Sequence, residues 1–457
     1  MKTNTLDLTQ GSIPKKIFLF FIPILCSSLF QQLYATFDAI IVGRIVGKIG
    51  LASIDCIAQL LYLPISFFNG IAAGSTIMIS QYFGARLYNK LKDSVHTAIA
   101  FAFTFGILIS LLGYFSTPWI LSHMSIPDEI YPHTLAYARI FFGGLGFALI
   151  YNIGAGILRA VGNTKLPFQI LMISGIVNIA LDLILVGPMH QGVKGAAIAT
   201  TAAQGVSSLL VIYALVGTQD VYQLVLKDIK FHKEHFIQII KYGLPTALQF
   251  SLYPIGNILI QIAVNSMGTN NIAAYGLCSK LSLFMWLQID SLGPSITTFV
   301  AQNIGAKQYD RVNKGVHTGL LIGHVMVGLA SIVLYFYSIP LGKLFINEAS
   351  YDILPLMETF MKFLAPCFIF YVASCIYGCT IQGTGQTFTP FLITLIFTCI
   401  YRVVWMIFYI PTHFTMRAIL ECYILSWIFT SLAFLVYYIP FKKKHITSQI
   451  QKETVTE

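Results

Sequence analysis

A succession of long apolar runs constrains this chain more than any single motif. A helix rises 1.5 Å per residue, so about 20 apolar residues cross a hydrocarbon core of ~30 Å. The runs follow one another with short connections and no long polar block. We therefore predict an all-α polytopic membrane protein with twelve transmembrane helices, at about residues 16–42, 54–82, 95–117, 131–157, 166–187, 193–217, 237–265, 272–301, 316–339, 355–381, 390–411 and 417–440.

The charges lie between these spans. Only 10% of the residues are charged and 56% are hydrophobic, against about 25% charged in an ordinary globular domain. The net charge of +10 would suggest nucleic acid in a soluble protein, but here the basic residues flank the spans, so we expect no nucleic-acid partner. Nineteen lysines and arginines fall on the side of the N-terminus, Lys2 and Lys452 among them, and five on the other. The positive-inside rule then places both termini in the cytoplasm, with the spans in the cell membrane.

Two motif pairs indicate an internal repeat, which defines the architecture of a chain. SQYFGARLYN (80–89) matches AQNIGAKQYD (301–310), and ILRAVGNTKLPF (157–168) matches TIQGTGQTFTPF (380–391) at nearly the same offset, as do Pro23 and Pro245. We predict two pseudo-symmetric six-helix lobes, residues 1–217 and 237–457, joined by a cytoplasmic linker at 218–236. Since six is even, both lobes enter the membrane from one side, as in a parallel repeat.

An amide and a carboxylate interrupt the apolar span at 166–187. Asn178 and Asp182 are four residues apart, so they share one face of a helix. An ionised carboxylate inside a bilayer costs at least ~2.5 to 3.5 kcal/mol unless it meets a partner or a wet cavity. Asp182 therefore has either a hydrogen-bonding role between helices or a role in handling an ion or proton.

Several motifs in this order resemble the multidrug and toxic compound extrusion (MATE) family over essentially the whole chain. The resemblance rests on QxxGA at Gln81 and Gln302, on GNTKLP and GQTFTP, and on PILCSSLFQQLYATFDAIIVGRIVG near the N-terminus. It implies a secondary active multidrug efflux transporter that antiports small cationic amphipathic compounds out of the cytoplasm against H⁺ or Na⁺. It implies no cofactor and no catalytic residues, with membrane lipids as the surroundings and a monomer as the working unit.

The DinF-like prokaryotic branch of that family implies an ion-coupling site in the first lobe. Asp38, Asn178, Asp182 and Thr200 fall on its positions, and Tyr137 matches an aromatic hydroxyl of the same cavity. Carboxylate, amide and hydroxyl oxygens suit a hard cation such as Na⁺. Two neighbouring carboxylates also suit a proton relay, so both coupling ions stay open. In the family Pro23 is where the first helix bends, and it is either a hinge or a fixed kink.

The second half departs from the sodium-driven NorM-like branch, because its first span has no carboxylate. We expect a substrate cavity lined by Gln31, Gln249, Asn257, Asp290 and Arg402, and we expect Arg402 to pair with an acid inside the membrane. Glu358 and Lys362, four apart, should form an ion pair. Gly70 and Gly74 should allow a close contact between helices.

Two other functions compete with drug export. A lipid-linked oligosaccharide flippase of the same superfamily usually carries more basic residues in its cavity and often two extra helices, and neither feature is evident. A membrane-embedded enzyme needs a nucleophile with a base, or a metal cluster, within the spans, and the sequence offers no such constellation.

Overall fold

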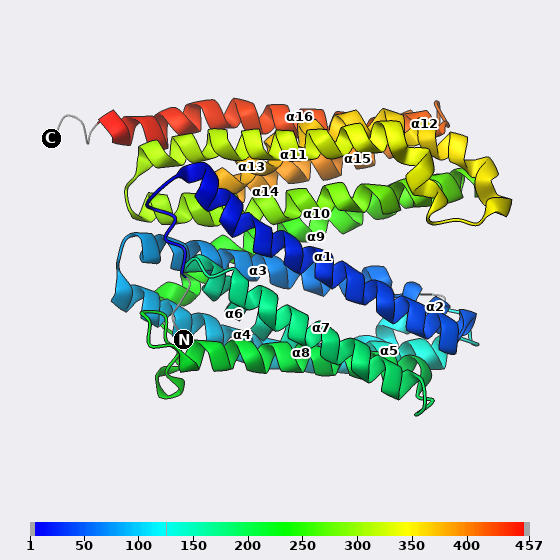
Figure 1. The fold of residues 1–457 in the computed structure, drawn as a ribbon, viewed down its shortest axis with the longest axis horizontal. Helices are drawn as coiled ribbons and strands as arrows, with labels where there is room; N and C mark the ends of the chain where they lie inside the picture. The colour runs from blue at the N-terminus through cyan, green and yellow to red at the C-terminus, as the bar shows by residue number, and fades with distance from the viewer. Residues whose placement is uncertain (1–4, 125, 452–457) are drawn as a thin grey trace. The chain divides into compact units, whose positions relative to one another are not determined.

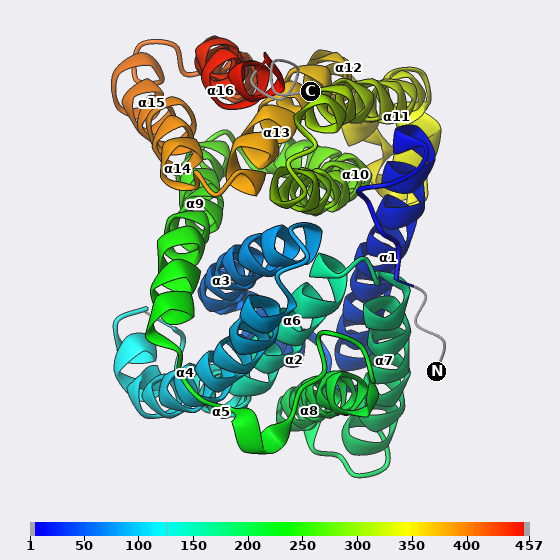
Figure 2. The same cartoon turned by 90° about the vertical axis from the view of Figure 1, so that its left-hand side faces the viewer.

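The computed structural model describes residues 5–124 and 126–451, and within them the chain is helical and contains no strand. Eleven helices are long and apolar enough to cross a membrane, and α5 with α6, which meet at a bend of 41°, provide a twelfth span. The prediction of an all-α polytopic membrane protein is confirmed. The α-helices of the described chain (Figures 1 and 2) are α1 Ile13–Ile45, α2 Lys48–Asp55, α3 Ala58–Gly84, α4 Tyr88–Ser122, α5 Tyr131–Gly143, α6 Leu145–Ala160, α7 Lys165–Val186, α8 Gly192–Gly217, α9 Lys233–Asn265, α10 Thr269–Gly305, α11 Tyr309–Lys343, α12 Leu354–Leu364, α13 Phe368–Gly383, α14 Phe388–Thr394, α15 Tyr401–Val404 and α16 Met416–Lys442.

The chain forms two compact units. Unit 1 contains the residues up to Asp7 and Leu19–Ala247, and unit 2 contains Leu8–Phe18 and the chain from Leu248 onward. The boundaries therefore run through α1 and α9, the first helices of the two predicted halves, a few residues from Pro23 and Pro245. The lobe boundaries at 217 and 237 stay a prediction.

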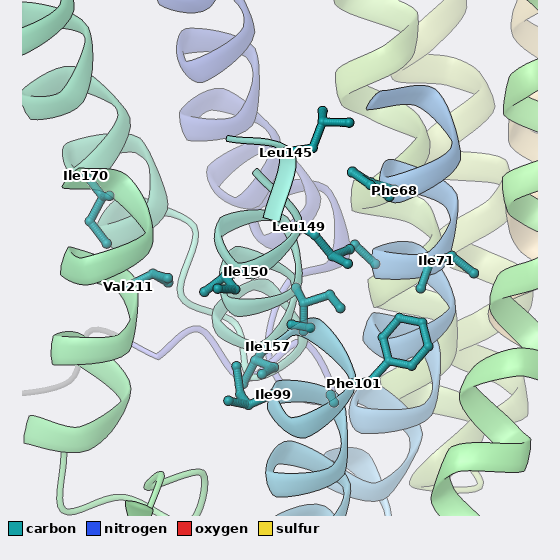
Figure 3. Close-up of a cluster of buried hydrophobic side chains, with 14 of the residues drawn as sticks. Phe68, Ile71, Ile99, Phe101, Leu145, Leu149, Ile150, Ile157, Ile170 and Val211 are labelled. Carbon is teal, nitrogen blue, oxygen red and sulfur yellow. The ribbon is translucent and has the colours of Figure 1, made fainter. Parts of the chain in front are cut away.

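The core of unit 1 is a continuous apolar cluster to which α1 and the helices from α3 to α9 contribute. Branched and aromatic side chains of α3, α4 and α6 face one another, and α7 and α8 add Ile170 and Val211 (Figure 3). Val211 can lie directly on α6 because Gly154 has no side chain; a Cβ there would come within 2.7 Å of Val211. This core fixes the positions of α6, α7 and α8 relative to one another.

Two glycines of α3 bring it into contact with the first part of α9, within unit 1. A Cβ added at Gly70 would lie 2.2 Å from Cα of Ala247, and one added at Gly74 would lie 2.3 Å from the backbone nitrogen of Gly243. Small residues thus face each other on both helices, so the backbones pack directly. The predicted role of Gly70 and Gly74 is confirmed.

The repeat is also present in the backbone. Positive φ angles, which are uncommon for residues other than glycine, occur at matching places of the two halves. The matching pairs are Gly47 (83°) with Gly268 (88°), Arg86 (57°) with Lys307 (58°), and Gly162 (91°) with Gly385 (91°).

The segment between α8 and α9 packs against α4 in unit 1. His96 donates from Nδ1 to the carbonyl of Lys92 (2.7 Å), which leaves Nε2 to accept the N–H of Val225 (3.0 Å). Lys92 also forms an ion pair with Asp228 at 3.3 Å. The predicted linker is therefore anchored along its length.

Candidate functional site

The centre of the candidate site is a pair of carboxyl groups on α1 and α7. Asp182 is fully buried, with none of its surface exposed, and Asn178 one turn earlier is 1% exposed. Asp38 of α1 is half-buried, and its carboxyl group lies within hydrogen-bonding range of that of Asp182. Two ionised carboxylates offer only acceptors, so this contact becomes a hydrogen bond when one of them carries a proton.

Most polar atoms of this pair, and both of those in the side chain of Asn178, lack hydrogen-bond partners in the described chain. Oδ1 of Asp38, both carboxylate oxygens of Asp182 and both side-chain polar atoms of Asn178 are buried without a hydrogen-bond partner in the described chain. A buried charge without a partner is strongly unfavourable. These oxygens are the ligands that a hard cation prefers, so the residues present fit a bound Na⁺ as well as a shared proton.

The site has further walls on α5 and α8. Tyr137 of α5 is 8% exposed, lies within the electrostatic field of both carboxyl groups and stacks on Phe141, with ring centroids 6.3 Å apart. Thr200 is half-buried on α8, which packs along α7, and its hydroxyl makes no hydrogen bond to either carboxylate within the described residues. The structure thus gathers Asp38, Asp182 and Tyr137, with Asn178 beside them, and leaves Thr200 at the edge.

Gly175 allows α1 to lie close to α7, and sequence analysis missed it. A Cβ at Gly175 would come within 2.6 Å of the ring of Phe30 and 3.1 Å of the ring of Tyr34. Tyr34 is one turn before Asp38 on α1, and Gly175 is one turn before Asn178 on α7. The indication available in the sequence was that Tyr34 and Asp38 are four residues apart and therefore share one face of α1.

Local capping explains where α7 begins. Oδ1 of Asn163 accepts the N–H of Leu166 at 3.1 Å, which satisfies one of the free donors in the first turn. Gly162 precedes it with φ of 91° and receives the N–H of Leu6 on its carbonyl at 3.1 Å. The GNTKLP motif therefore fixes the start of the helix that carries Asn178 and Asp182.

Helix α1 continues through Pro23 without a break. The hydroxyl of Ser27 donates to the carbonyl of Pro23 at 2.7 Å. The boundary between the units falls between Phe18 and Leu19, about one turn before this proline.

The residues expected in the substrate cavity are distributed over both units. Gln31 lies exposed on α1 in unit 1. In unit 2, Gln249 is buried between two partners: it donates to the Thr394 hydroxyl at 3.0 Å and accepts from Gln382 at 2.8 Å.

Arg402 differs from the prediction. It donates to Oδ1 of Asn257 (3.1 Å) and to the hydroxyl of Ser426 (3.2 Å), and its guanidinium lies 4.7 Å from the ring centroid of Tyr423. No carboxylate of the described chain pairs with it, so the expected acid partner was wrong. An amide, a hydroxyl and an aromatic face provide the contacts instead.

Two acids of the spans pair with a basic residue one turn away on the same helix. Glu358 pairs with Lys362 at 2.8 Å, as predicted from their spacing. Glu421 pairs with Arg417 at 3.0 Å on the same helix.

A MatE family model matches the chain twice, over residues 23–184 and 245–407. The chain belongs to the MATE family. The two matches cover the two halves of the repeat. As a MATE transporter the chain is a multi-pass membrane protein and not an enzyme, which excludes the membrane-embedded enzyme as an alternative.

Relatives and a solved structure match between 66% and 98% of this MATE chain. The probable multidrug resistance protein YoeA of Bacillus subtilis is 28% identical over 97% of both chains. The FAD transporter of Shewanella oneidensis is 25% identical over 66% of this chain and 68% of its own length. A MOP superfamily transporter from Pyrococcus furiosus shares the fold with a TM-score of 0.88 at 19% identity, over 98% of this chain and 99% of that chain.

Proposed function

We propose that this MATE protein is a secondary active exporter of small cationic amphipathic compounds, driven by inward H⁺ or Na⁺ through the site of Asp38 and Asp182. The single observation that carries the proposal is the pair of carboxyl groups at Asp38 and Asp182, in which Oδ1 of Asp38 and both oxygens of Asp182 are buried and meet no donor in the described chain. Relatives named for multidrug resistance support the export of drug-like molecules rather than of lipid-linked oligosaccharides.

Ion binding would change the charge of this site. When both carboxylates are ionised, Asp38 on α1 and Asp182 on α7 repel each other in a medium of low dielectric constant. A proton between Asp38 and Asp182, or a Na⁺ held by their oxygens together with Asn178, Thr200 and Tyr137, removes that repulsion and favours a close approach of the two helices. The downhill movement of the bound ion supplies the free energy for export. Helix α1 would respond to ion binding by bending at Pro23.

Dye efflux from inverted vesicles, with the proton and sodium gradients imposed separately, tests the proposal. We expect one of the two gradients to drive accumulation of a cationic dye, and the other to have no effect once the first is collapsed by an ionophore. Accumulation that persists without either gradient would contradict secondary active transport.

The substrate concentration gradient that the exporter can sustain depends on the net charge moved across the membrane in each cycle. One monovalent ion crossing ~100 mV releases about 2.3 kcal/mol, and each 1.4 kcal/mol is tenfold in concentration, so one ion per neutral substrate sustains roughly 50-fold accumulation. A substrate of charge +1 exchanged for one H⁺ moves no net charge, so its transport should depend on the pH difference and hardly on voltage. A strong voltage dependence at zero pH difference would exclude one-for-one exchange.

The topology makes a separate prediction. Both termini and the segment at 218–236 should lie in the cytoplasm, because the side that they share carries nineteen basic residues against five. Of these, Lys2 and Lys452 lie outside the described residues. Reporter fusions at residues 228 and 457 should give cytoplasmic signals, and a periplasmic signal at either would overturn the arrangement.

A further inference from the structure

Unit 1 contains a cavity of about 120 Å³ between α3, α4, α6 and the first part of α9. Its lining residues are all phenylalanine, isoleucine or leucine. Four of them are at most 4% exposed and form the inner wall, namely Phe68 and Ile71 of α3, Phe101 of α4 and Leu149 of α6 (Figure 3). An apolar cavity of this size stays free of water and takes up small apolar groups. The cavity therefore suits a hydrocarbon ligand.

The cavity reaches the surface of unit 1 beside α9. Leu244 of α9 lines it and is 40% exposed. On α4, the lining residue Ile109 is followed along the helix by Leu111 and Leu112, which are exposed, and is preceded by Leu108, which is exposed as well. Helices α4 and α9 are both long and apolar enough to span a membrane. The mouth of the cavity thus lies on a surface that faces acyl chains and not water.

Aromatic rings bound the cavity toward the start of α9. Phe236 lies with its ring centroid 6.1 Å from that of Phe101 and 6.3 Å from that of Phe105, two residues of the lining. Phe231, in the segment before α9, packs on Phe236 at 5.6 Å. A ligand therefore enters from the side, past Leu244, and not along α9 from its first turn.

The chain around the start of α9 combines basic and exposed apolar side chains. Residues 88–93 and 227–241 contain six lysines and three acids. Leu226, Phe231 and Ile237 are exposed among these lysines. This combination is typical of segments that lie at the boundary between headgroups and acyl chains, and an excess of lysine attracts anionic lipids.

The distance between this segment and the cavity matches the depth of one leaflet. Helix α9 begins at Lys233, and the lining residues Ile240 and Leu244 follow seven and eleven residues later. At 1.5 Å per residue they lie ~10 and ~16 Å along the helix. Half of a ~30 Å hydrocarbon core is ~15 Å thick. A lipid with its headgroup at the start of α9 would therefore place the end of its chain at the cavity.

We propose that this cavity binds one acyl chain of an anionic phospholipid, whose phosphate lies at the lysines around the start of α9, Lys230 and Lys233 among them. The chain would complete the packing of α9, which lies on α3 so closely that a Cβ at Gly243 would come within 3.1 Å of Cα of Ile71. The ligand is a resident lipid and not cargo, so the proposal does not depend on the proposed export function.

Photo-crosslinking of the full-length protein in liposomes tests the site. The probe is phosphatidylglycerol with a diazirine in the terminal half of one acyl chain, and a phosphatidylcholine with the same chains is its zwitterionic counterpart. Fragment masses of the digested protein identify the labelled residues. Labels on Phe68, Ile71 or Leu149 report the cavity, because lipid outside cannot reach these buried side chains, whereas labels on Leu209 of α8, which is 70% exposed, report the surrounding lipid.

Wild-type protein should carry labels at both places, and phosphatidylglycerol should label the cavity at least threefold more than phosphatidylcholine does at the same mole fraction. Leu149→Phe fills part of the cavity and should reduce labelling of Phe68 and Ile71 at least fivefold, with labelling of Leu209 unchanged. Leu209→Phe is the matched control and should leave the cavity labels as they are. Lys230→Gln with Lys233→Gln should remove the preference for phosphatidylglycerol, whereas Lys314→Gln, at an exposed ion pair of unit 2, should keep it.

Labels confined to exposed residues of the wild-type protein would overturn the proposal, and this measurement requires no variant. Equal cavity labelling by the two lipids would overturn the assignment to an anionic lipid. If Leu149→Phe is not monodisperse, Ile240→Phe makes the same test from α9, and cavity labels that persist in a monodisperse filled variant would also contradict the site. No gradient is used, so a failure of dye efflux would contradict the proposed function without affecting this result.

Discussion

Asp182→Asn should reduce gradient-driven efflux to the background rate while the protein still inserts and accumulates normally. The amide keeps the shape of the carboxyl group and its place among buried neighbours, but it neither exchanges a proton near neutral pH nor offers a charged ligand to a cation. Asp38→Asn should have the same effect, because the two carboxyl groups interact directly. The measurement is dye accumulation in inverted vesicles under the active gradient, normalised to protein in the membrane.

The double variant should be no worse than either single one, since residues that act as a unit lose their function together. Glu358→Gln is the matched control: it removes a carboxylate from the spans, but one that already pairs with Lys362. If both asparagine variants pump at the wild-type rate, the coupling site lies elsewhere, and Asp290 is the next residue to test. If Glu358→Gln reduced efflux as much as the asparagine variants do, the loss of any carboxylate from the spans would be harmful.

Gly70→Leu should remove most of the folded protein. Its Cβ alone would lie 2.2 Å from the backbone of Ala247, a distance that no side-chain rotation relieves, and α3 would have to separate from α9. Overpacking commonly costs ~1 to 3 kcal/mol, and here the obstacle is backbone, so we expect the upper end or beyond. Size-exclusion chromatography with a thermal-shift assay in detergent should show a large loss of monodisperse protein.

Gly328→Leu makes the same change at a glycine of α11 where an added Cβ would meet no other part of the described chain within 4 Å. It should leave the protein folded, because the side chain enters open space. Equal damage by both substitutions would mean that adding a leucine to any of these helices is harmful, and the close contact between α3 and α9 would lose its significance.

The architecture was predictable because it depends on properties that a sequence displays. The lengths of the apolar runs predicted the spans, and the spacing of the motifs predicted the repeat. The matched φ angles of Arg86 and Lys307 show the repeat again in the backbone. The proximity of Asp38 to Asp182 was accessible only through family resemblance, since no local pattern relates two residues that are so far apart in the chain.

Arg402 shows what sequence reasoning could not supply. A charge inside a span requires a partner, and the electrostatic argument favours an acid. The partners are instead Asn257 of α9 and Ser426 and the ring of Tyr423 of α16. Neutral donors and acceptors are common in the spans, so only the packing decides which of them meet the guanidinium. The role of Gly175 was also inaccessible from the sequence, because it depends on the contact with Phe30 of another helix.

The membership of Leu8–Phe18 in unit 2 bears on the order of events during synthesis. The backbone N–H of Leu8 bonds Oε1 of Gln302, 294 residues later, and its carbonyl receives a donor from Arg311. At 5 to 20 residues per second, a ribosome takes roughly 15 to 60 s to produce those partners. Residues Leu8–Phe18 are therefore among the first to be made and among the last to reach their native contacts, and in a growing chain released before about residue 311 this segment has not yet met its partners in unit 2.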